Sequence, residues 1–221
     1  MDSGEITGSI NGIYDRLNLI SGLRLHMFMV AAVGESIIDN WNGASAVING
    51  GDIIAALLLH DIGNIVKFDF DEPKFWNGKS AEEIGYWKGI KRDTIERYGT
   101  SSDKEVTLGM ASDLGINPRL FFLLSNMGFG NVQSALASND FELKICMYAD
   151  QRVGPSGIMG IRERFRDLRE RYGRGDNWVD KVGLALENQI FAHARIAPSE
   201  ISDASVQRYI DGYRAASQRI R

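Results

Sequence analysis

The stretch from Ala56 to Lys67 reads Ala-Leu-Leu-Leu-His-Asp-Ile-Gly-Asn-Ile-Val-Lys. An apolar run ends here in an adjacent imidazole and carboxylate, those of His60 and Asp61. Polar groups at the end of a buried segment cost free energy unless they are paired or bind a metal ion. We therefore interpret His60 and Asp61 as two ligands of one divalent metal ion, at the end of a helix that is central to the fold.

Helical periodicity dominates on both sides of this stretch, and alternating strand-like runs are scarce. The sequence predicts an all-α bundle of about eight to ten helices. We expect a single domain over residues 1–221, with a core over about 10–172 and C-terminal helices over 178–221 packed on it. The expected helices are Ile10–Ile20, Leu23–Trp41, Asp52–His60, Ser80–Tyr98, Ser102–Gly115, one beginning at Asn117-Pro118, Phe141–Val153, Ile161–Tyr172, Trp178–Ala197 and Ser202–Arg221. Between them, Phe68–Lys79 is expected to be a loop of the kind that covers sites.

Composition excludes several classes of protein. The chain has 221 residues, 44% of them hydrophobic, a formal net charge of −4 and a pI of about 5.5, which does not favour dedicated nucleic-acid binding. The single cysteine, Cys146, excludes an intramolecular disulfide and fits a reducing compartment. No stretch approaches the ~20 apolar residues of a membrane helix, and Met1–Ser9 does not resemble a signal peptide. The sequence therefore predicts a cytoplasmic protein without a membrane partner.

Two further polar residues stand where apolar residues are expected. His26 lies within a long apolar helix, and Asp150 ends the buried run Ile145–Ala149. Taken singly, His26 could be a core histidine bonded to a backbone carbonyl, and Asp150 could cap a helix or pair with a nearby arginine. One metal ion explains both of them together with His60 and Asp61.

Two imidazoles and two carboxylates suit one divalent ion of Mn²⁺, Fe²⁺, Co²⁺, Ni²⁺ or Zn²⁺, whereas Mg²⁺ is less suited to imidazole ligands. Four protein ligands on a six-coordinate ion leave two positions, one for water and one for a phosphate oxygen. Such an ion lowers the pKa of its water from roughly 15.7 to about 7 and neutralises charge on phosphoryl oxygens. This chemistry favours hydrolysis of a phosphate ester.

The order His26, then His60-Asp61, then Asp150 resembles the HD superfamily of metal-dependent phosphohydrolases. The tetrapeptide at residues 60–63 matches the HDIG form of its motif, and the spacings of 34 residues from His26 to His60 and 89 from Asp61 to Asp150 also fit. The resemblance covers about residues 23–153. It implies an HD-domain-like helical bundle and hydrolysis of a nucleotide or another small phosphomonoester.

Departures from the family pattern refine this expectation. Members that bind two metal ions use additional histidines, and this chain has no histidine from Asp61 to Ala192, so a mononuclear site is expected. In the resembling deoxynucleoside 5′-monophosphatases a catalytic Glu stands at the place of Asn64, which cannot act as a base. Asp69 matches an acidic position of that group and is the candidate general acid, beside Asp61 as the catalytic metal ligand.

Three cations are candidate phosphate contacts: Arg24, Lys67 and Arg152, each with a surface charge or a structural ion pair as the alternative. A different class of function also stays open, a non-catalytic nucleotide-binding or signalling module that retains the metal ion. A di-iron oxygenase is disfavoured because the extra histidines are missing. The sequence leaves a homodimer open.

Overall fold

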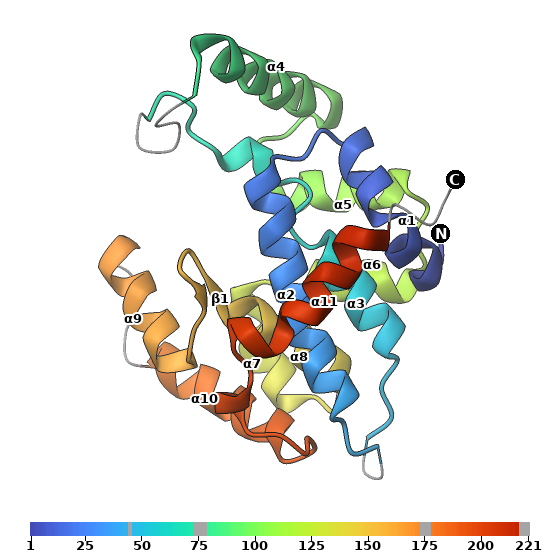
Figure 1. Ribbon diagram of the computed structural model, residues 1–221, viewed down its shortest axis with the longest axis vertical. Helices are drawn as coiled ribbons and strands as arrows, with labels where there is room; N and C mark the ends of the chain where they lie inside the picture. The colour runs from blue at the N-terminus through green and yellow to red at the C-terminus, as the bar shows by residue number, and fades with distance from the viewer. Residues whose placement is uncertain (44–45, 73–78, 173–177, 217–221) are drawn as a thin grey trace.

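The regular secondary structure is almost entirely helical (Figure 1). The structure, a computed structural model, describes residues 1–43, 46–72, 79–172 and 178–216. The predicted all-α helical bundle is confirmed. The α-helices are α1 (Ser3–Arg16), α2 (Ser21–Asp39), α3 (Gly50–Leu59), α4 (Ala81–Tyr98), α5 (Asp103–Asp113), α6 (Pro118–Asn126), α7 (Val132–Ala137), α8 (Phe141–Gln151), α9 (Ile161–Tyr172), α10 (Trp178–Phe191) and α11 (Asp203–Ala215). Short 3₁₀-helices η1 (Asn64–Lys67), η3 (Phe129–Asn131) and η4 (Pro198–Glu200) connect some of them.

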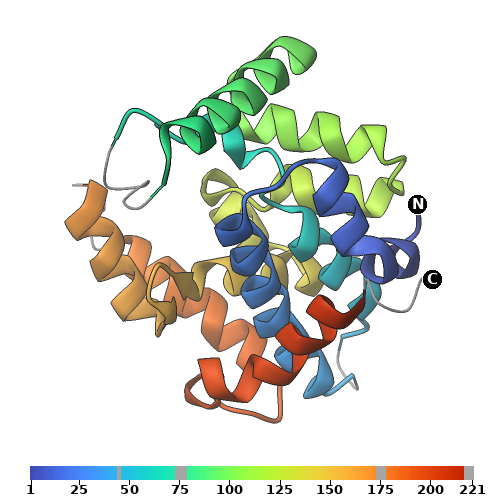
Figure 2. The same cartoon turned by 45° about the horizontal axis from the view of Figure 1, so that its top comes forward.

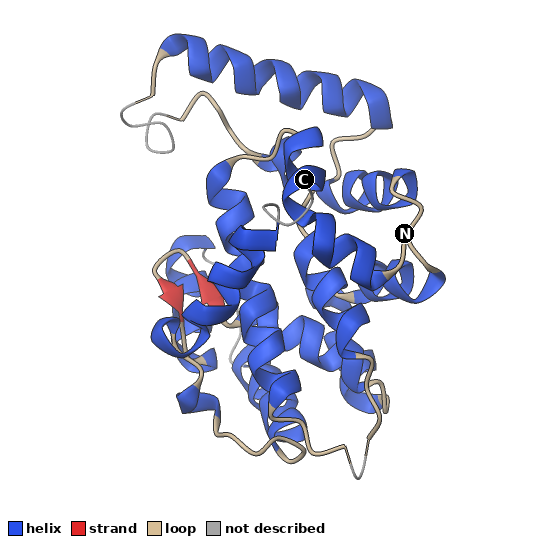
Figure 3. Cartoon of the chain, turned by 45° about the vertical axis from the view of Figure 1, so that its right-hand side comes forward, coloured by secondary structure: helices blue, strands red, loops and turns tan. Residues whose placement is uncertain are grey.

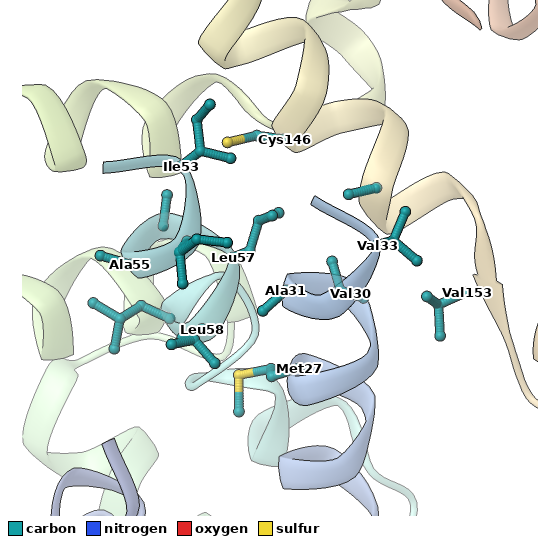
Figure 4. Packing of buried hydrophobic residues seen from close by; sticks show 14 of the residues in the cluster. Met27, Val30, Ala31, Val33, Ile53, Ala55, Leu57, Leu58, Cys146 and Val153 are labelled. Atoms are coloured by element: carbon teal, nitrogen blue, oxygen red, sulfur yellow. The ribbon is translucent and has the colours of Figure 1, made fainter. Parts of the chain in front are cut away.

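Helix α3 is the centre of the bundle. Asn49 caps its N-terminus by accepting a hydrogen bond from the backbone N–H of Asp52. Every residue from Ile53 to Leu59 is buried, as expected for a helix that is apolar on all sides. Helix α3 packs against α1, α2, α6 and α8, and Figure 4 shows side chains of α2, α3 and α8 filling the space between these helices.

The approach of α2 to α3 is close at Gly34. A Cβ atom at this position would lie 2.3 Å from Cδ1 of Leu57. The absence of a side chain at Gly34 therefore lets the two helices pack at short range, and α2 presents its buried face, which includes Met27 and Val30, to α3 (Figure 4). This packing fixes the position of His26, the neighbour of Met27, relative to the end of α3.

The chain begins its first helix earlier than the sequence predicted. Helix α1 starts at Ser3 rather than at Ile10 because Asp2 and Glu5 form a capping box. Ile6 and Ile10 are then both fully buried. The prediction treated this segment only as polar and acidic, and so overlooked the cap.

The C-terminal helices also contribute to the core. Helices α9 and α10 pack side by side (Figure 2), and α11 packs along α2. Buried residues from Ile6 in α1 to Tyr213 in α11 belong to one hydrophobic cluster. The division into a core over 10–172 and an added segment over 178–221 stays a prediction. Of the expected helix to Arg221, the residues after 216 lie outside the described part of the chain.

Two short elements were missed. Helix α7 has six residues, too few for a visible apolar period. A hairpin pairs β1 (Val153–Gly154) with β2 (Gly157–Ile158) where the sequence suggested only a helix break; it is the small sheet in Figure 3. Helix α4 lies across one end of the bundle in the same view, over η1 and α5. Phe75 and Trp76 of the predicted covering loop lie outside the described residues.

Helix α2 meets the length and composition of a membrane span, contrary to the sequence expectation. Its 18-residue window has a mean hydropathy of 1.2. This window is 56% buried inside the protein, where α2 contacts α3, α8 and α11. We therefore assign α2 as a core helix, and cytoplasmic localisation stays a prediction.

Candidate metal centre

The four predicted ligands come from three elements and meet at one place. His26 lies on α2, His60 and Asp61 follow the last residue of α3, and Asp150 lies in the last turn of α8. Nε2 of His26 is 3.6 Å from Oδ2 of Asp61 and 3.7 Å from Oδ1 of Asp150. Nε2 of His60 is 3.6 Å and 3.5 Å from the same two oxygens.

These distances are too long for ordinary hydrogen bonds, which span about 2.7–3.2 Å. They are close to the separation of two ligands bound to one ion, because atoms about 2.1 Å from a common centre lie about 3.0–3.5 Å apart at octahedral to tetrahedral angles. Within the cluster, the ligand atoms of His26, His60 and Asp150 all lie within 4.8 Å of one another. These three side chains could hold a metal ion.

The orientation of His60 is fixed by its own helix. Its Nδ1 lies 2.7 Å from the carbonyl oxygen of Leu57. Because a carbonyl only accepts hydrogen bonds, Nδ1 carries the proton and donates it, which leaves the lone pair of the neutral ring on Nε2. The side chain is 6% exposed, and Nε2 is buried with no hydrogen-bond partner among the described residues.

An unpartnered buried nitrogen is unfavourable in a native protein and needs an explanation. A metal ion at the centre of the cluster provides a partner for Nε2. The hydrogen bond from Nδ1 of His60 to the carbonyl of Leu57 has the form that metal-bound imidazoles commonly show. The adjacent carbonyl of Leu58 accepts a hydrogen bond of 2.6 Å from the hydroxyl of Tyr14. Side chains therefore donate to the carbonyls of both Leu57 and Leu58 at the end of α3.

The charges of the cluster favour a cation. Burial opposes protonation of His60, but the carboxylates of Asp61 and Asp150 outweigh it and raise the pKa of His60 to about 9. Burial likewise disfavours the Asp150 carboxylate, yet attraction by His26 and His60 holds its pKa well below the usual range. The C-termini of α3 and α8 add partial negative charge from their last carbonyls. A divalent ion would replace the proton on His60.

A pocket of about 200 Å³ opens next to the cluster. Its volume is smaller than the roughly 300–1,000 Å³ of sites for drug-sized ligands, which favours a small ligand. Charged and polar residues form one part of its wall and apolar or small residues form another. The lining residues are His60, Asp61, Lys67, Asp103, Lys104, Thr107, Leu124, Met127, Gly128 and Asp150.

Gly63 explains how α5 reaches this pocket. Its backbone N–H donates a 3.0 Å hydrogen bond to Oγ1 of Thr107. A Cβ atom on Gly63 would lie 2.5 Å from the backbone nitrogen of Thr107 and 2.7 Å from the carbonyl oxygen of Asp103. The glycine of the HDIG tetrapeptide therefore allows the first turns of α5 to pack directly against the turn that carries Asp61.

Lys67 is the predicted phosphate contact that the structure brings to the pocket. It lies at the end of η1, and its Nζ is 2.5 Å from Oδ2 of Asp103. Asp69, the predicted general acid, lies elsewhere. It is exposed and lines a separate hollow beside α4, and its Oδ1 accepts a hydrogen bond from the backbone of Asp71. Its catalytic role stays a prediction that this placement does not support.

The two arginines predicted as phosphate contacts have other partners in the structure, so that role stays a prediction that their placement does not support. Arg24 donates to the carbonyls of Leu19 and Tyr14 and pairs with Asp15 at 2.5 Å. It therefore ties the end of α1 to the start of α2.

Arg152 is 3% exposed and also binds other parts of the protein. Its guanidinium donates to the Tyr148 hydroxyl, the Met159 carbonyl, the Pro198 carbonyl at 3.2 Å and the Ile201 carbonyl at 3.0 Å. It fastens the end of α8, and hence the neighbourhood of Asp150, to the hairpin and to the connection before α11. Four of the five N–H donors of this guanidinium are used within the protein, and the side chain is buried, so the structure supports a structural role for Arg152.

Sequence reasoning missed the contribution of α5 and α6 to the site. Asp103, Lys104 and Thr107 come from α5, and Leu124 and Met127 from the end of α6. A signal was present in Gly63, since glycine is common where another part of the backbone approaches closely. The sequence does not say which helix approaches it.

Comparisons with known proteins returned no match. No protein-family model matches the chain, no curated protein matches it, and no solved structure matches it. The resemblance to the HD superfamily therefore stays an expectation that rests on the motif residues alone.

Proposed function

We propose that this chain is a metal-dependent phosphohydrolase of the HD type, which binds one divalent ion and hydrolyses a nucleotide or another small phosphomonoester. The ligands are His26, His60, Asp61 and Asp150. The observation that carries the proposal is the buried Nε2 of His60, which has no partner among the described residues and stands 3.5–3.6 Å from two carboxylate oxygens. The expected metals are Mn²⁺, Fe²⁺, Co²⁺, Ni²⁺ or Zn²⁺, with Mg²⁺ less suited.

A divalent ion in this site supplies an acidified water and neutralises charge on the phosphoryl oxygens. Hydrolysis then joins the water oxygen to phosphorus and breaks the bond between phosphorus and the organic oxygen, which leaves with a proton as an alcohol. The protein contributes a fixed imidazole at His60, a carboxylate at Asp150 whose pKa is held well below its usual range by His26 and His60, and a small pocket beside them.

The ion pair of Lys67 with Asp103 supports a mononuclear site. Asp103 is the one carboxylate lining the pocket, among the described residues, that lies outside the four-residue cluster. Its charge is balanced by the Lys67 ammonium at 2.5 Å. A second metal ion would have to displace that lysine, and no histidine lies nearby in sequence to replace it.

The test is a phosphatase panel on EDTA-stripped protein, with p-nitrophenyl phosphate, the nucleoside monophosphates and sugar phosphates, in the presence of each candidate metal. We expect activity with at least one metal, and a loss of at least about 100-fold in His60→Ala and Asp61→Ala, because loss of a ligand exceeds the roughly 10–100-fold effect of losing a hydrogen-bond partner of a ligand. The matched control is His193→Gln, which changes the remaining histidine, stacked on Trp41 far along the chain. Full activity in His60→Ala would exclude the proposal.

One observation favours the alternative of a binding or signalling module that retains the ion without turnover. Asn64 stands where the resembling monophosphatases have a catalytic Glu, and the remaining pocket carboxylate, that of Asp103, is held by Lys67. Among the described residues, the pocket thus has no free carboxylate to act as a base. Metal-dependent binding of a nucleotide with no hydrolysis across the panel would support this alternative.

A further inference from the structure

The two lysines of the metal pocket are in different electrostatic situations. Lys67 is balanced by Asp103. Lys104 is exposed and lines the same pocket, yet no carboxylate lies within 4.0 Å of its Nζ in the part of the chain that the structure describes. An ammonium group without an acidic partner, next to a candidate metal centre, is available to an anionic ligand.

The position of Lys104 is set by the core rather than by a loose loop. It lies in the first turn of α5, and Thr107 follows three residues later on the same pocket wall. Thr107 is buried and is bonded to Gly63 of the metal-binding turn. The backbone that carries Lys104 is therefore anchored to the segment that carries Asp61.

The charge of the pocket shows what Lys104 adds. The carboxylates and lysines that line the pocket are Asp61, Asp103, Asp150, Lys67 and Lys104, and without the proton on His60 that a metal ion would displace they carry one net negative charge. A divalent ion changes this to one net positive charge, and without Lys104 the pocket would then be neutral. Attraction for a phosphate dianion thus depends on both the ion and Lys104.

We propose that Lys104 binds the phosphate group of the substrate in the pocket beside the metal centre. This inference rests on the proposed function, because it assigns a residue to the same site. The contact is a charge-assisted hydrogen bond from the Nζ ammonium to a phosphate oxygen. It assigns to Lys104 the role that the sequence assigned to Arg24 and Arg152.

The experiment measures binding of inorganic phosphate by isothermal titration calorimetry. The protein is EDTA-stripped and then loaded with one equivalent of Co²⁺, with no excess metal. We expect Lys104→Met to weaken phosphate binding about tenfold, in line with the worth of a hydrogen bond to a charged group at a partly solvated site. Lys104→Arg keeps the charge and should retain most of the affinity, and unloaded protein should not bind phosphate.

Two controls separate the contact from general charge effects. Lys181→Met removes an exposed lysine of α10 and should leave phosphate affinity unchanged. The pair Lys67→Met with Asp103→Asn removes two opposite charges from the pocket and should change affinity less than Lys104→Met does. Melting curves of the loaded proteins show that each variant is folded.

The outcomes distinguish this inference from the proposed function. An unchanged phosphate affinity in Lys104→Met, or no phosphate binding by the loaded wild type, overturns the inference. If the loaded wild type binds phosphate through Lys104 but hydrolyses nothing on the panel, the inference holds and the hydrolase proposal fails. If the wild type hydrolyses a substrate, Lys104→Met should raise KM more than it lowers kcat.

Discussion

Gly63→Ala tests the packing that brings α5 to the turn that carries Asp61. Gly63 has φ −87° and ψ −4°, a conformation that any residue adopts, so alanine introduces no backbone strain. The problem is space alone, because the added Cβ would lie 2.5 Å from the backbone nitrogen of Thr107. That distance is 0.9 Å short of the 3.4 Å at which ordinary van der Waals contact begins.

The nearest atoms are backbone atoms of α5, so a side-chain rotation cannot relieve the clash. Helix α5 has to move away, which strains its packing and stretches the hydrogen bond from Gly63 to Oγ1 of Thr107. Overpacking of this kind costs about 1–3 kcal/mol, and loss of one hydrogen bond about 1 kcal/mol, so we expect about 2–3 kcal/mol in the free energy of unfolding. For a chain of this size the melting temperature should fall by about 5–10 °C.

The assay is urea unfolding, with the midpoint and slope both measured. The matched control is Gly85→Ala on α4, where a Cβ atom meets nothing within 4 Å; it should stabilise the protein by up to about 1 kcal/mol through helix propensity. If Gly63→Ala unfolds at the same urea concentration as the wild type, with an unchanged slope, the result contradicts the close packing of α5 against Gly63.

Four other predictions concern single residues. Arg152→Met should lower the free energy of unfolding by about 3 kcal/mol, seen by urea unfolding, because three carbonyls and the Tyr148 hydroxyl, all at least partly buried, lose a charged donor. Metal affinity should rise about tenfold per pH unit up to about pH 9 and then level off, with about one proton released per ion in calorimetry at pH 7–8, since the ion displaces the proton of His60, whose pKa is about 9. In metal-free protein, protonated His60 stabilises the fold, because its pKa is higher in the folded than in the unfolded chain. This stabilisation is complete below the unfolded pKa of about 6.5 and is lost as the pH rises to about 9. Thermal melting should therefore occur at higher temperature at pH 6 than at pH 9. Asp69→Asn should change kcat by less than about twofold, whereas a general acid contributes about 100-fold or more; a large loss would restore the catalytic role of Asp69.

The elements that the sequence predicted well are those with local signals. Helices α4 and α5 begin where expected, because capping involves residues only three apart: Ser80 and Glu83 form a capping box, and the Ser102 side chain accepts a hydrogen bond from the backbone N–H of Glu105. The wholly apolar run before His60 identified the central helix α3, because this signal also lies within one short segment. The early start of α1 at Asp2 was equally local and was missed only because its first turn looks polar.

The candidate site was predicted in part. The four cluster residues were selected because each is polar in an apolar context, and such an anomaly is visible in sequence. The partners of Arg24 and Arg152 were not visible, because they are mostly backbone carbonyls, which every residue has. Lys104 was also invisible, since its place in the pocket follows from the packing of α5 on Gly63 and not from its own neighbours in sequence.

The most direct test of the account is a count of metal ions by the electron paramagnetic resonance signal of free Mn²⁺, titrated into EDTA-stripped protein. The account predicts one tight site per chain, a site lost in both His60→Ala and Asp150→Asn, and a site retained in the matched variants His193→Gln and Asp69→Asn. A wild-type chain that leaves all of the added Mn²⁺ free, or an equally tight site in His60→Ala, would contradict the convergence of these side chains on one ion.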